Sequence, residues 1–175
     1  FAGGIPSPDL FPTKEFTELF GKIMSEYGLQ PLVYGITEGY APLIKTVSDM
    51  LGGNGILHET DSVVITTGAQ QAIDLTAKSI VNDGEGIIVE EPSFIGSLNS
   101  FRSYYARLFG VEMDSDGINI EKTEQILKSE NIKLIYTIHT FQNPMGVTMS
   151  AEKRKQLLEL AETYDCYVNE DNPYG

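Results

Sequence analysis

Residues 86–94 read Gly86-Ile87-Ile88-Val89-Glu90-Glu91-Pro92-Ser93-Phe94. Their three successive β-branched aliphatic side chains predict a strand that ends at the two acids. Apolar residues then recur at helical spacing over residues 95–105, and another strand pattern occupies residues 107–111. A strand, a helix and a second strand in this order predict a βαβ unit with parallel strands.

The alternation of strands and helices extends in both directions from this unit. Towards the N-terminus we expect a strand at residues 62–66 and a helix at residues 69–81. Towards the C-terminus we expect a helix at 120–129, a strand at 134–138, a helix capped by Ser150 and a last strand at Tyr167 and Val168. The sequence therefore predicts an α/β fold, in which helices cover both faces of a mostly parallel sheet.

Two amphipathic helices are predicted in the N-terminal part of the chain. One starts at Thr13, a residue type that favours N-caps, and stops at Gly28. Its apolar positions fall on one face: Phe16, Leu19, Phe20, Ile23, Met24 and Tyr27. The other helix begins near Pro42 and ends in a glycine-rich stretch. We expect residues 1–55 to form an N-terminal segment with linker helices, and residues 56–175 to belong to a larger domain.

The composition is that of a globular protein, with 41% hydrophobic and 21% charged residues among 175. A formal net charge of −13 argues against nucleic acid or an anionic membrane as the main partner. The single cysteine, Cys166, excludes an internal disulfide framework and favours a cytoplasmic protein. The chain starts at Phe1 and stops at Gly175, directly after a motif, which favours a fragment of a longer protein.

Four polar loops are expected at one edge of the sheet, because ligands of open parallel sheets bind outside the carboxyl ends of the strands. These loops are residues 66–70, 90–94, 139–144 and 170–174. Gly68 opens a helix whose free N–H groups favour an anion such as phosphate. The other loops add the aromatic ring of Phe94, the amide of Asn143, and Asp171 with Tyr174. Together they suit a flat, charged, heteroaromatic ligand.

Each of these residues also has a purely structural interpretation. Phe94 follows a proline and is of a type that packs into cores, and Asn143-Pro144 is typical of a tight turn. A hydrolase with two carboxylates, Glu90 or Glu91 together with Glu170 or Asp171, is a further alternative. The hydrolase alternative assigns no function to the helix start at residues 68–70 or to the amide of Asn143. A metal site is weaker still, because His58 and His139 lack ligand spacing.

The ordered set of motifs resembles the class I/II aminotransferases of the aspartate-aminotransferase fold, which use pyridoxal 5′-phosphate (PLP). The 2-aminoadipate and kynurenine aminotransferase-like branch is the most similar. The matching stretches are residues 1–6, Tyr34 with 37–40, 67–72, 91–94, 141–146 and 170–174. They occur in the family's order and span the whole chain. The resemblance implies that residues 56–175 are the first part of the PLP-binding large domain, with its remainder and the small domain absent.

The resemblance also implies a role for each matching residue. Asp171 would contact the pyridine nitrogen, and Asn143 and Tyr174 would hydrogen-bond the ring's 3-oxygen. The backbone N–H groups of Ala69 and Gln70 would bind the phosphate, and Phe94 would stack on the ring. Tyr34 would reach the phosphate of the other subunit of a homodimer, and Gly4 would lie beside the substrate carboxylate. The substrates would be an amino acid and a 2-oxo acid, which places the protein in amino acid metabolism and biosynthesis.

This sequence departs from the family pattern at several positions. Phe94 replaces a more usual tyrosine, and Ala69 replaces a common serine, so one phosphate hydroxyl donor is lost. Asn172 stands where a second acid is frequent. The resemblance implies that the Schiff-base lysine and the substrate-binding arginine would lie beyond Gly175, so we expect this fragment alone to be inactive. A transcription regulator with an aminotransferase-like effector domain shares every motif, and a DNA-binding segment before Phe1 would identify it.

Overall fold

The computed structural model describes residues 6–173, so Gly4 and Tyr174 lie outside the described residues. The chain divides into two compact units that meet in sequence between Thr66 and Thr67. Helices make up the first unit: η1 (Pro8–Leu10), α1 (Thr13–Tyr27), η2 (Gln30–Leu32) and α2 (Ala41–Gly53). The predicted start of a large domain at residue 56 stays a prediction, because compactness alone does not define a domain.

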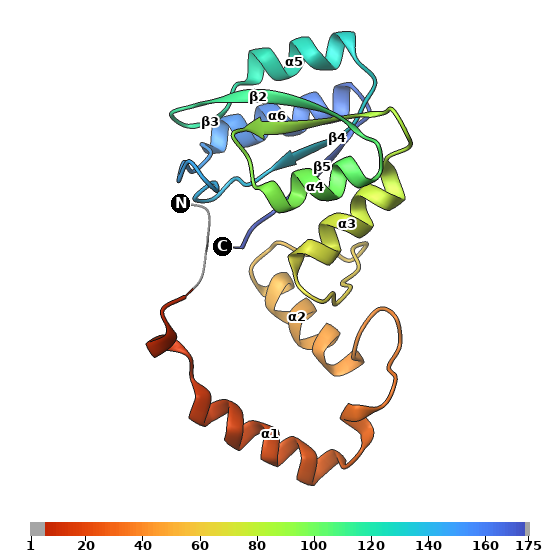
Figure 1. The fold of residues 1–175 in the computed structure, drawn as a ribbon, viewed down its shortest axis with the longest axis vertical. Helices are drawn as coiled ribbons and strands as arrows, with labels where there is room; N and C mark the ends of the chain where they lie inside the picture. The colour runs from red at the N-terminus through yellow and green to blue at the C-terminus, as the bar shows by residue number, and fades with distance from the viewer. Residues whose placement is uncertain (1–5, 174–175) are drawn as a thin grey trace. The chain divides into compact units, whose positions relative to one another are not determined.

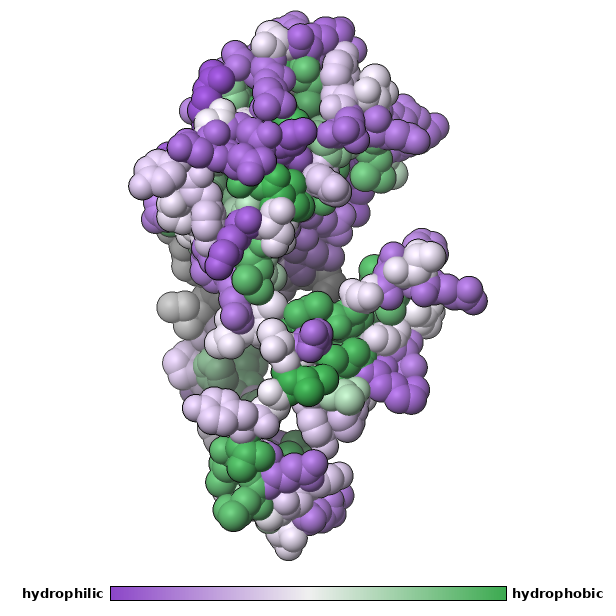
Figure 2. Space-filling model, turned by 90° about the vertical axis from the view of Figure 1, so that its right-hand side faces the viewer, coloured by the Kyte–Doolittle hydropathy of each residue, from purple (hydrophilic) through white to green (hydrophobic). Residues whose placement is uncertain are grey.

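The two long helices of the N-terminal unit form where they were predicted. Gly28 ends α1 with φ +58°, as expected of a glycine C-cap, whereas Pro12 and not Thr13 occupies the N-cap position. The predicted apolar stripe is present, yet neither α1 nor α2 contains a buried residue. Figure 2 shows the resulting apolar patches on the surface of this unit. The apolar faces of α1 and α2 are therefore not buried in a core formed by residues 6–66.

The expectation of a strand at residues 62–66 is wrong for this structure. These residues are extended but belong to no ladder, and the N–H of Ile65 donates to the oxygen of Glu38 at 2.9 Å. A strand needs a neighbour to complete its backbone hydrogen bonds. Within the described residues no strand lies beside this segment.

The second unit is built around a sheet of five strands in the order β3-β2-β1-β4-β5 (Figure 1). In chain order its elements are α3 (Ala69–Ile80), β1 (Gly86–Glu91), α4 (Ile95–Ser103), β2 (Arg107–Asp114), β3 (Gly117–Ile118), α5 (Ile120–Ser129), β4 (Ile132–Thr137), α6 (Ala151–Thr163) and β5 (Tyr167–Glu170). Only β3 runs antiparallel to its neighbour. The alternation predicted from residue 69 onward and the mostly parallel sheet are confirmed.

The core consists of two layers of apolar side chains, one on each face of the sheet. Successive residues of a strand point to opposite faces, so Ile87 and Val89 of β1 join the layer beneath α3 and α4. Ile88 joins the layer beneath α5 and α6. Burial of each such side chain contributes on the order of 2 kcal/mol. The prediction that helices cover both faces is thereby confirmed.

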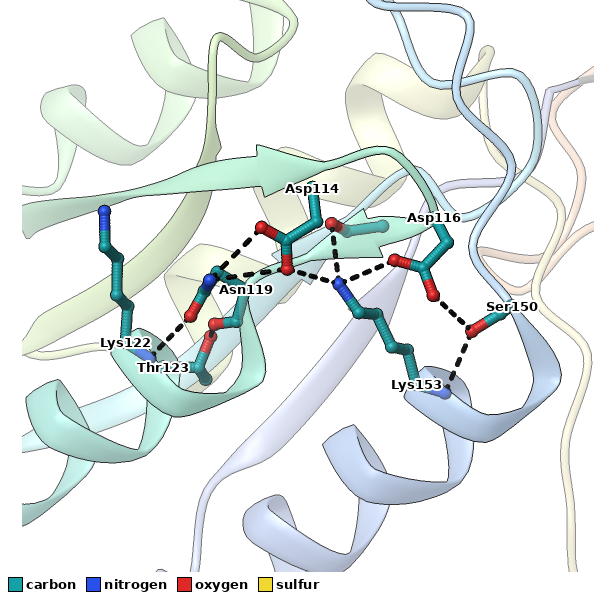
Figure 3. A network of polar contacts seen from close by, with 8 residues as sticks. Asp114, Asp116, Asn119, Lys122, Thr123, Ser150 and Lys153 are labelled. Carbon is teal, nitrogen blue, oxygen red and sulfur yellow. Dashed lines mark hydrogen bonds and ion pairs between the residues drawn. The ribbon is translucent and has the colours of Figure 1, made fainter.

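The antiparallel strand β3 was not predicted, because it is only two residues long. It turns back on β2 through Gly117, whose φ of +128° excludes most side chains. The ammonium group of Lys153, in the first turn of α6, holds this hairpin (Figure 3). Its Nζ lies 2.6 Å from Asp114 Oδ2 and 2.9 Å from Asp116 Oδ1, and it also donates to the oxygen of Gly117.

The charges around Lys153 stabilise one another. Burial acts to lower the pKa of Lys153, but hydrogen bonds to Asp114 and Asp116 outweigh it and raise that pKa. The hydrogen bond from Lys153 in turn lowers the pKa of both carboxyl groups. The Ser150 hydroxyl caps α6 by accepting from the N–H of Lys153, as predicted from the sequence, and donates to Asp116. Lys153 and Ser150 thus connect the hairpin to the start of α6 and to the loop before that helix.

Among residues 6–173, no helix combines the length and the apolar character needed to span a lipid bilayer.

Replacing Lys153 with Met in the full-length protein should lower the midpoint of thermal unfolding by about 3 °C, since two ion pairs of a largely buried ammonium are lost. Lys155→Met is the matched control on the same helix. Its partner Glu159 lies 3.7 Å away and both side chains are exposed, so a shift below about 1 °C is expected. Equal shifts in the two variants would contradict the anchoring role of Lys153.

Candidate functional site

The carboxyl ends of β1, β4 and β5 lie side by side, because these strands pair in parallel. Val89 is level with Tyr136, and Thr137 is level with Glu170. The N–H of Asp171 donates to the oxygen of Thr137 at 2.9 Å, which extends the β4–β5 pairing by one residue. The segments that follow these three strands therefore start from one edge of the sheet, as the sequence predicted.

The start of α3 presents free backbone donors. Gly68 precedes the helix with φ +77°, a conformation that L side chains rarely adopt. The N–H groups of Ala69 and Gln70 have no acceptor inside the helix, since they belong to its first turn. Apart from Gly68 and its two chain neighbours, no described residue has an atom within 4 Å of the place a Cβ on Gly68 would take. A phosphate group fits this open helix start.

Phe94 and Gln70 come together at Gly96. A Cβ added to Gly96 would lie 2.6 Å from Gln70 Oε1 and 2.6 Å from Phe94 Cε1. The Gln70 amide also donates to the oxygen of Gly96 at 3.0 Å and to the Ser100 hydroxyl at 2.7 Å. Phe94 is half-buried and packs against the core layer beneath α3 and α4. The aromatic ring thus lies beside the start of α3, and glycine at position 96 permits this approach.

Asp171 is held at the same edge by a buried tyrosine. The hydroxyl of Tyr136 donates to Asp171 Oδ2 at 2.7 Å, and the hydroxyl of Ser97 donates to that of Tyr136 at 2.7 Å. Burial raises the pKa of Tyr136 far above its usual range, so the phenol keeps its proton and acts as a donor. Gly96 and Ser97 are neighbours in the first turn of α4. This turn therefore contacts both the start of α3 and the network that ends at Asp171.

Glu90 forms a second buried polar cluster behind this edge. Its carboxylate accepts from the Thr137 hydroxyl at 2.5 Å, from the N–H of Ile138 at 3.3 Å and from the Gln142 amide at 2.9 Å. Burial raises the pKa of Glu90, and the hydrogen bonds from Thr137 and Gln142 act against that rise. Its side chain is only 1% exposed. A substrate cannot reach it, so the hydrolase interpretation loses its first candidate acid.

Gln142 shapes the turn that carries Asn143. Its Nε2 donates to Glu90 and to the oxygen of Pro92, each at 2.9 Å, and its Oε1 accepts from the N–H of Met145 at 2.8 Å. Gln142 is 1% exposed, whereas Asn143 is half-buried. The turn therefore holds Asn143 near the surface of the edge and is itself attached to β1 through a buried amide.

His139 lies at the end of β4 and faces β5. Its Nδ1 is 3.4 Å from Glu170 Oε1 but makes no hydrogen bond, and the residue is 5% exposed. Burial lowers the pKa of His139. The Glu170 carboxylate acts against this shift, and the guanidinium of Arg154 adds to it. A neutral imidazole thus fills the space between the two strand ends.

Not every residue singled out from the sequence is placed by the structure at this edge. Tyr34 belongs to the N-terminal unit and is fully exposed there, while Gly4 and Tyr174 lie outside the described residues. Within the described part of the chain, no three His, Cys, Asp or Glu side chains are grouped so as to hold a metal ion.

Tyr136, Ser97 and the role of Gln142 were not found by sequence reasoning. One signal for Tyr136 was available, since its hydroxyl lies in an otherwise apolar strand and a buried hydroxyl needs a partner. The identity of that partner depends on the position of α4. The apolar periodicity of a strand carries no information about that position.

The chain belongs to the aminotransferase class I and II family, whose model matches residues 30–175. It is 37% identical to aromatic-amino-acid aminotransferase 1 of Thermococcus litoralis, over 99% of this chain and 43% of that protein. It is also 37% identical to the 2-aminoadipate transaminase of Thermus thermophilus, with the same coverage. The chain thus spans less than half the length of these relatives.

Solved aminotransferases share the fold. The kynurenine aminotransferase of Pyrococcus horikoshii, in complex with PMP, matches with a TM-score of 0.94 at 38% identity, over 99% of this chain and 44% of that one. LysN, the α-aminoadipate aminotransferase of Thermus thermophilus complexed with N-(5′-phosphopyridoxyl)-L-leucine, matches with a TM-score of 0.87 at 36% identity, over 98% and 43%. The predicted aminotransferase fold is confirmed. An HTH-type transcriptional regulator of Bacillus subtilis is also 31% identical, over 100% of this chain and 40% of its own length.

Gln142→Leu should lower the free energy of unfolding of the full-length protein by about 3 kcal/mol, because it leaves buried partners without hydrogen bonds. Chemical denaturation followed by circular dichroism measures this loss. Gln156→Leu removes a half-buried amide whose hydrogen bond to Glu152 lies at the surface, and a change below about 0.5 kcal/mol is expected. A small loss in Gln142→Leu would show that the Glu90 cluster does not stabilise the edge.

The lowered pKa of His139 predicts a contribution to acid unfolding. Because the folded state disfavours the proton, the stability due to neutral His139 is complete above its unfolded pKa of about 6.5 and is lost as the pH falls towards the lower folded value. His139→Gln should therefore reduce the slope of unfolding free energy against pH between about 7 and 5, by up to about 1.4 kcal/mol per pH unit. Chemical denaturation at several pH values measures this slope. A wild-type slope in His139→Gln would contradict this assignment.

Proposed function

We propose that this chain forms the first part of the PLP-binding large domain of an aminotransferase, which transfers an amino group between an amino acid and a 2-oxo acid. The observation that carries the proposal is the first turn of α4. Through Gly96 it contacts the phosphate-type helix start at Gln70, and through Ser97 and Tyr136 it reaches the Asp171 carboxylate. A helix start that would suit an anion and an acid thereby share one edge, and a phosphorylated pyridine ring would need both.

The residues at this edge fit the cofactor group by group. The N–H groups of Ala69 and Gln70 would bind the phosphate, and the ring of Phe94 beside them would stack on the pyridine. Asp171 would contact the ring nitrogen, while Asn143 and Tyr174 would hydrogen-bond the 3-oxygen. One of the two solved aminotransferases is in complex with PMP and the other with N-(5′-phosphopyridoxyl)-L-leucine, which supports the same choice of cofactor.

Bound PLP supplies an electron sink for the bond that the amino acid loses at its Cα. The chain's own residues set the conditions for that chemistry. A carboxylate about 3 Å from a ring nitrogen favours its protonated form by on the order of 5 kcal/mol at an effective dielectric of ~20, before desolvation is subtracted. Asp171 would supply this charge, and an amide in its place would not. The first turn of α3 would hold the phosphate and so fix the position of the ring.

Substrates and partners follow from the family and its relatives. The named relatives act on aromatic amino acids and 2-aminoadipate, which supports an amino acid and a 2-oxo acid as substrates in amino acid metabolism. A homodimer with shared active sites is proposed as well, since Tyr34 is fully exposed and free to meet a second subunit. Gly4 would lie beside the substrate carboxylate, and a cytoplasmic location is proposed from the single cysteine.

A second candidate function is effector binding in a PLP-dependent transcription regulator. The Bacillus subtilis HTH-type relative, at 31% identity over the whole chain, favours it. The net charge of −13 argues against DNA contacts by these residues themselves. Sequencing upstream of Phe1 separates the two functions, because the regulator requires a DNA-binding segment there.

Asp171→Asn in the full-length protein should lower kcat by a factor on the order of 10³ while PLP still binds, because the charge at the ring nitrogen is lost but the phosphate contacts persist. Steady-state transamination and the absorbance of bound cofactor measure the two effects. Asp165→Asn, the same substitution in the exposed turn before β5, should leave kcat unchanged. Wild-type turnover in Asp171→Asn would reject the assignment.

A further inference from the structure

Asp171 is the end of a linear hydrogen-bond chain that begins in α4. Ser97 Oγ donates to the Tyr136 hydroxyl, and that hydroxyl donates to Asp171 Oδ2, both at 2.7 Å. A phenol has one proton to donate. Because Ser97 occupies the phenol oxygen as a donor, the tyrosine proton is directed towards Asp171.

Burial leaves the two hydroxyl groups without alternative partners. Tyr136 and Ser97 are each 0% exposed. The ring of Tyr136 packs edge-on against Phe101, with centroids 5.3 Å apart and planes at 71°, inside the core layer beneath α3 and α4. If the Asp171 side chain rotated away, the tyrosine hydroxyl would lose its acceptor in an apolar surrounding, which is unfavourable. The core therefore determines the orientation of this carboxylate.

The two oxygens of Asp171 are consequently not equivalent. Oδ2 accepts the hydrogen bond from Tyr136, whereas Oδ1 accepts none from residues 6–173. The backbone is fixed as well, since the N–H of Asp171 donates to Thr137. With one oxygen and the backbone held, the remaining oxygen has a defined direction.

We propose that Tyr136 and Ser97 are positioning residues, which hold Asp171 Oδ2 so that Oδ1 is presented to the ring nitrogen of the cofactor. The inference rests on the proposed function and adds to it the two residues that orient the acid. Hydrogen bonds to a carboxylate weaken steeply when the donor leaves the lone-pair direction. The benefit of this orientation is therefore specific to a ligand that carries an N–H at that position of the ring.

The test compares two ligands that differ only at that position. Equilibrium binding to the full-length apoprotein is measured for pyridoxal 5′-phosphate and for 1-deazapyridoxal 5′-phosphate, which has a C–H in place of the ring nitrogen. Tyr136→Phe keeps the aromatic packing and removes the hydroxyl. We expect it to weaken binding of pyridoxal 5′-phosphate about tenfold, or about 1.4 kcal/mol, and binding of the deaza ligand less than twofold. Ser97→Ala should show the same preference with about a threefold loss.

Tyr104→Phe is the matched control, because Tyr104 also donates to an aspartate, Asp74 Oδ2 at 2.9 Å, outside the edge. It should leave the ratio of the two affinities unchanged. Equal weakening of both ligands by Tyr136→Phe would overturn the positioning role and indicate a purely structural one. Should Tyr136→Phe fail to fold by circular dichroism, Ser97→Ala decides, and an unchanged affinity ratio in that variant overturns the inference.

Asp171→Asn distinguishes a failure of the proposed function from a failure of the positioning role. If it weakens both ligands equally, Asp171 does not contact the ring nitrogen and the proposed function fails. If it weakens only pyridoxal 5′-phosphate while Tyr136→Phe leaves the ratio unchanged, the proposed function stands and the positioning role is wrong. Selective loss in both single variants, with no further loss in the double variant Tyr136→Phe/Asp171→Asn, supports both.

Discussion

Parallel pairing of β1 with β4 and of β4 with β5 is the constraint on which the candidate site depends. Parallel strands have all their carboxyl ends at one edge, so residues as far apart in the chain as Glu90 and Gln142 meet there without any loop crossing the sheet. Glu90 lies near the carboxyl end of β1. Its buried carboxylate collects donors from β4 and from the turn after it, and the pairing of the strands is thereby fixed at the point where the loops begin.

The edge combines a buried polar base with more accessible functional groups. Glu90, Gln142, Ser97 and Tyr136 are buried, and all of them are hydrogen-bonded within the protein. Ala69 and Gln70 are exposed, and Asn143 and Asp171 are half-buried. Buried polar networks of this kind specify one arrangement, because each lost partner is costly in an apolar surrounding. A cofactor that depends on simultaneous contacts at its phosphate and its ring benefits from such a base.

Local patterns were sufficient to predict most of this fold. The apolar run at residues 87–89 and the Ser150 cap were found because their signals lie within a few residues of each other. Residues 62–66 carry an equally good strand pattern but form no strand, since pairing needs a neighbour and not a propensity. The two-residue strand β3 was missed because it is shorter than any recognisable period.

The functional groups of the site were also predictable in position, because Phe94, Asn143 and Asp171 follow strands in the sequence. Their roles came from the family resemblance and not from spacing. The support behind them was not predictable: Tyr136 and Asp171 are 35 residues apart, and their hydrogen bond requires the pairing of β4 with β5. Sequence patterns indicate which groups a strand delivers to an edge, whereas tertiary packing decides what orients them.

The outer side of β5 has a further consequence. Within residues 6–173 this strand has β4 as its neighbour on one side and none on the other, so one row of its peptide groups is available for docking by another extended segment. Asp171 follows that row directly. A polypeptide that paired there would add hydrogen bonds to the backbone that leads into this acid, in addition to the one that the N–H of Asp171 already donates to Thr137.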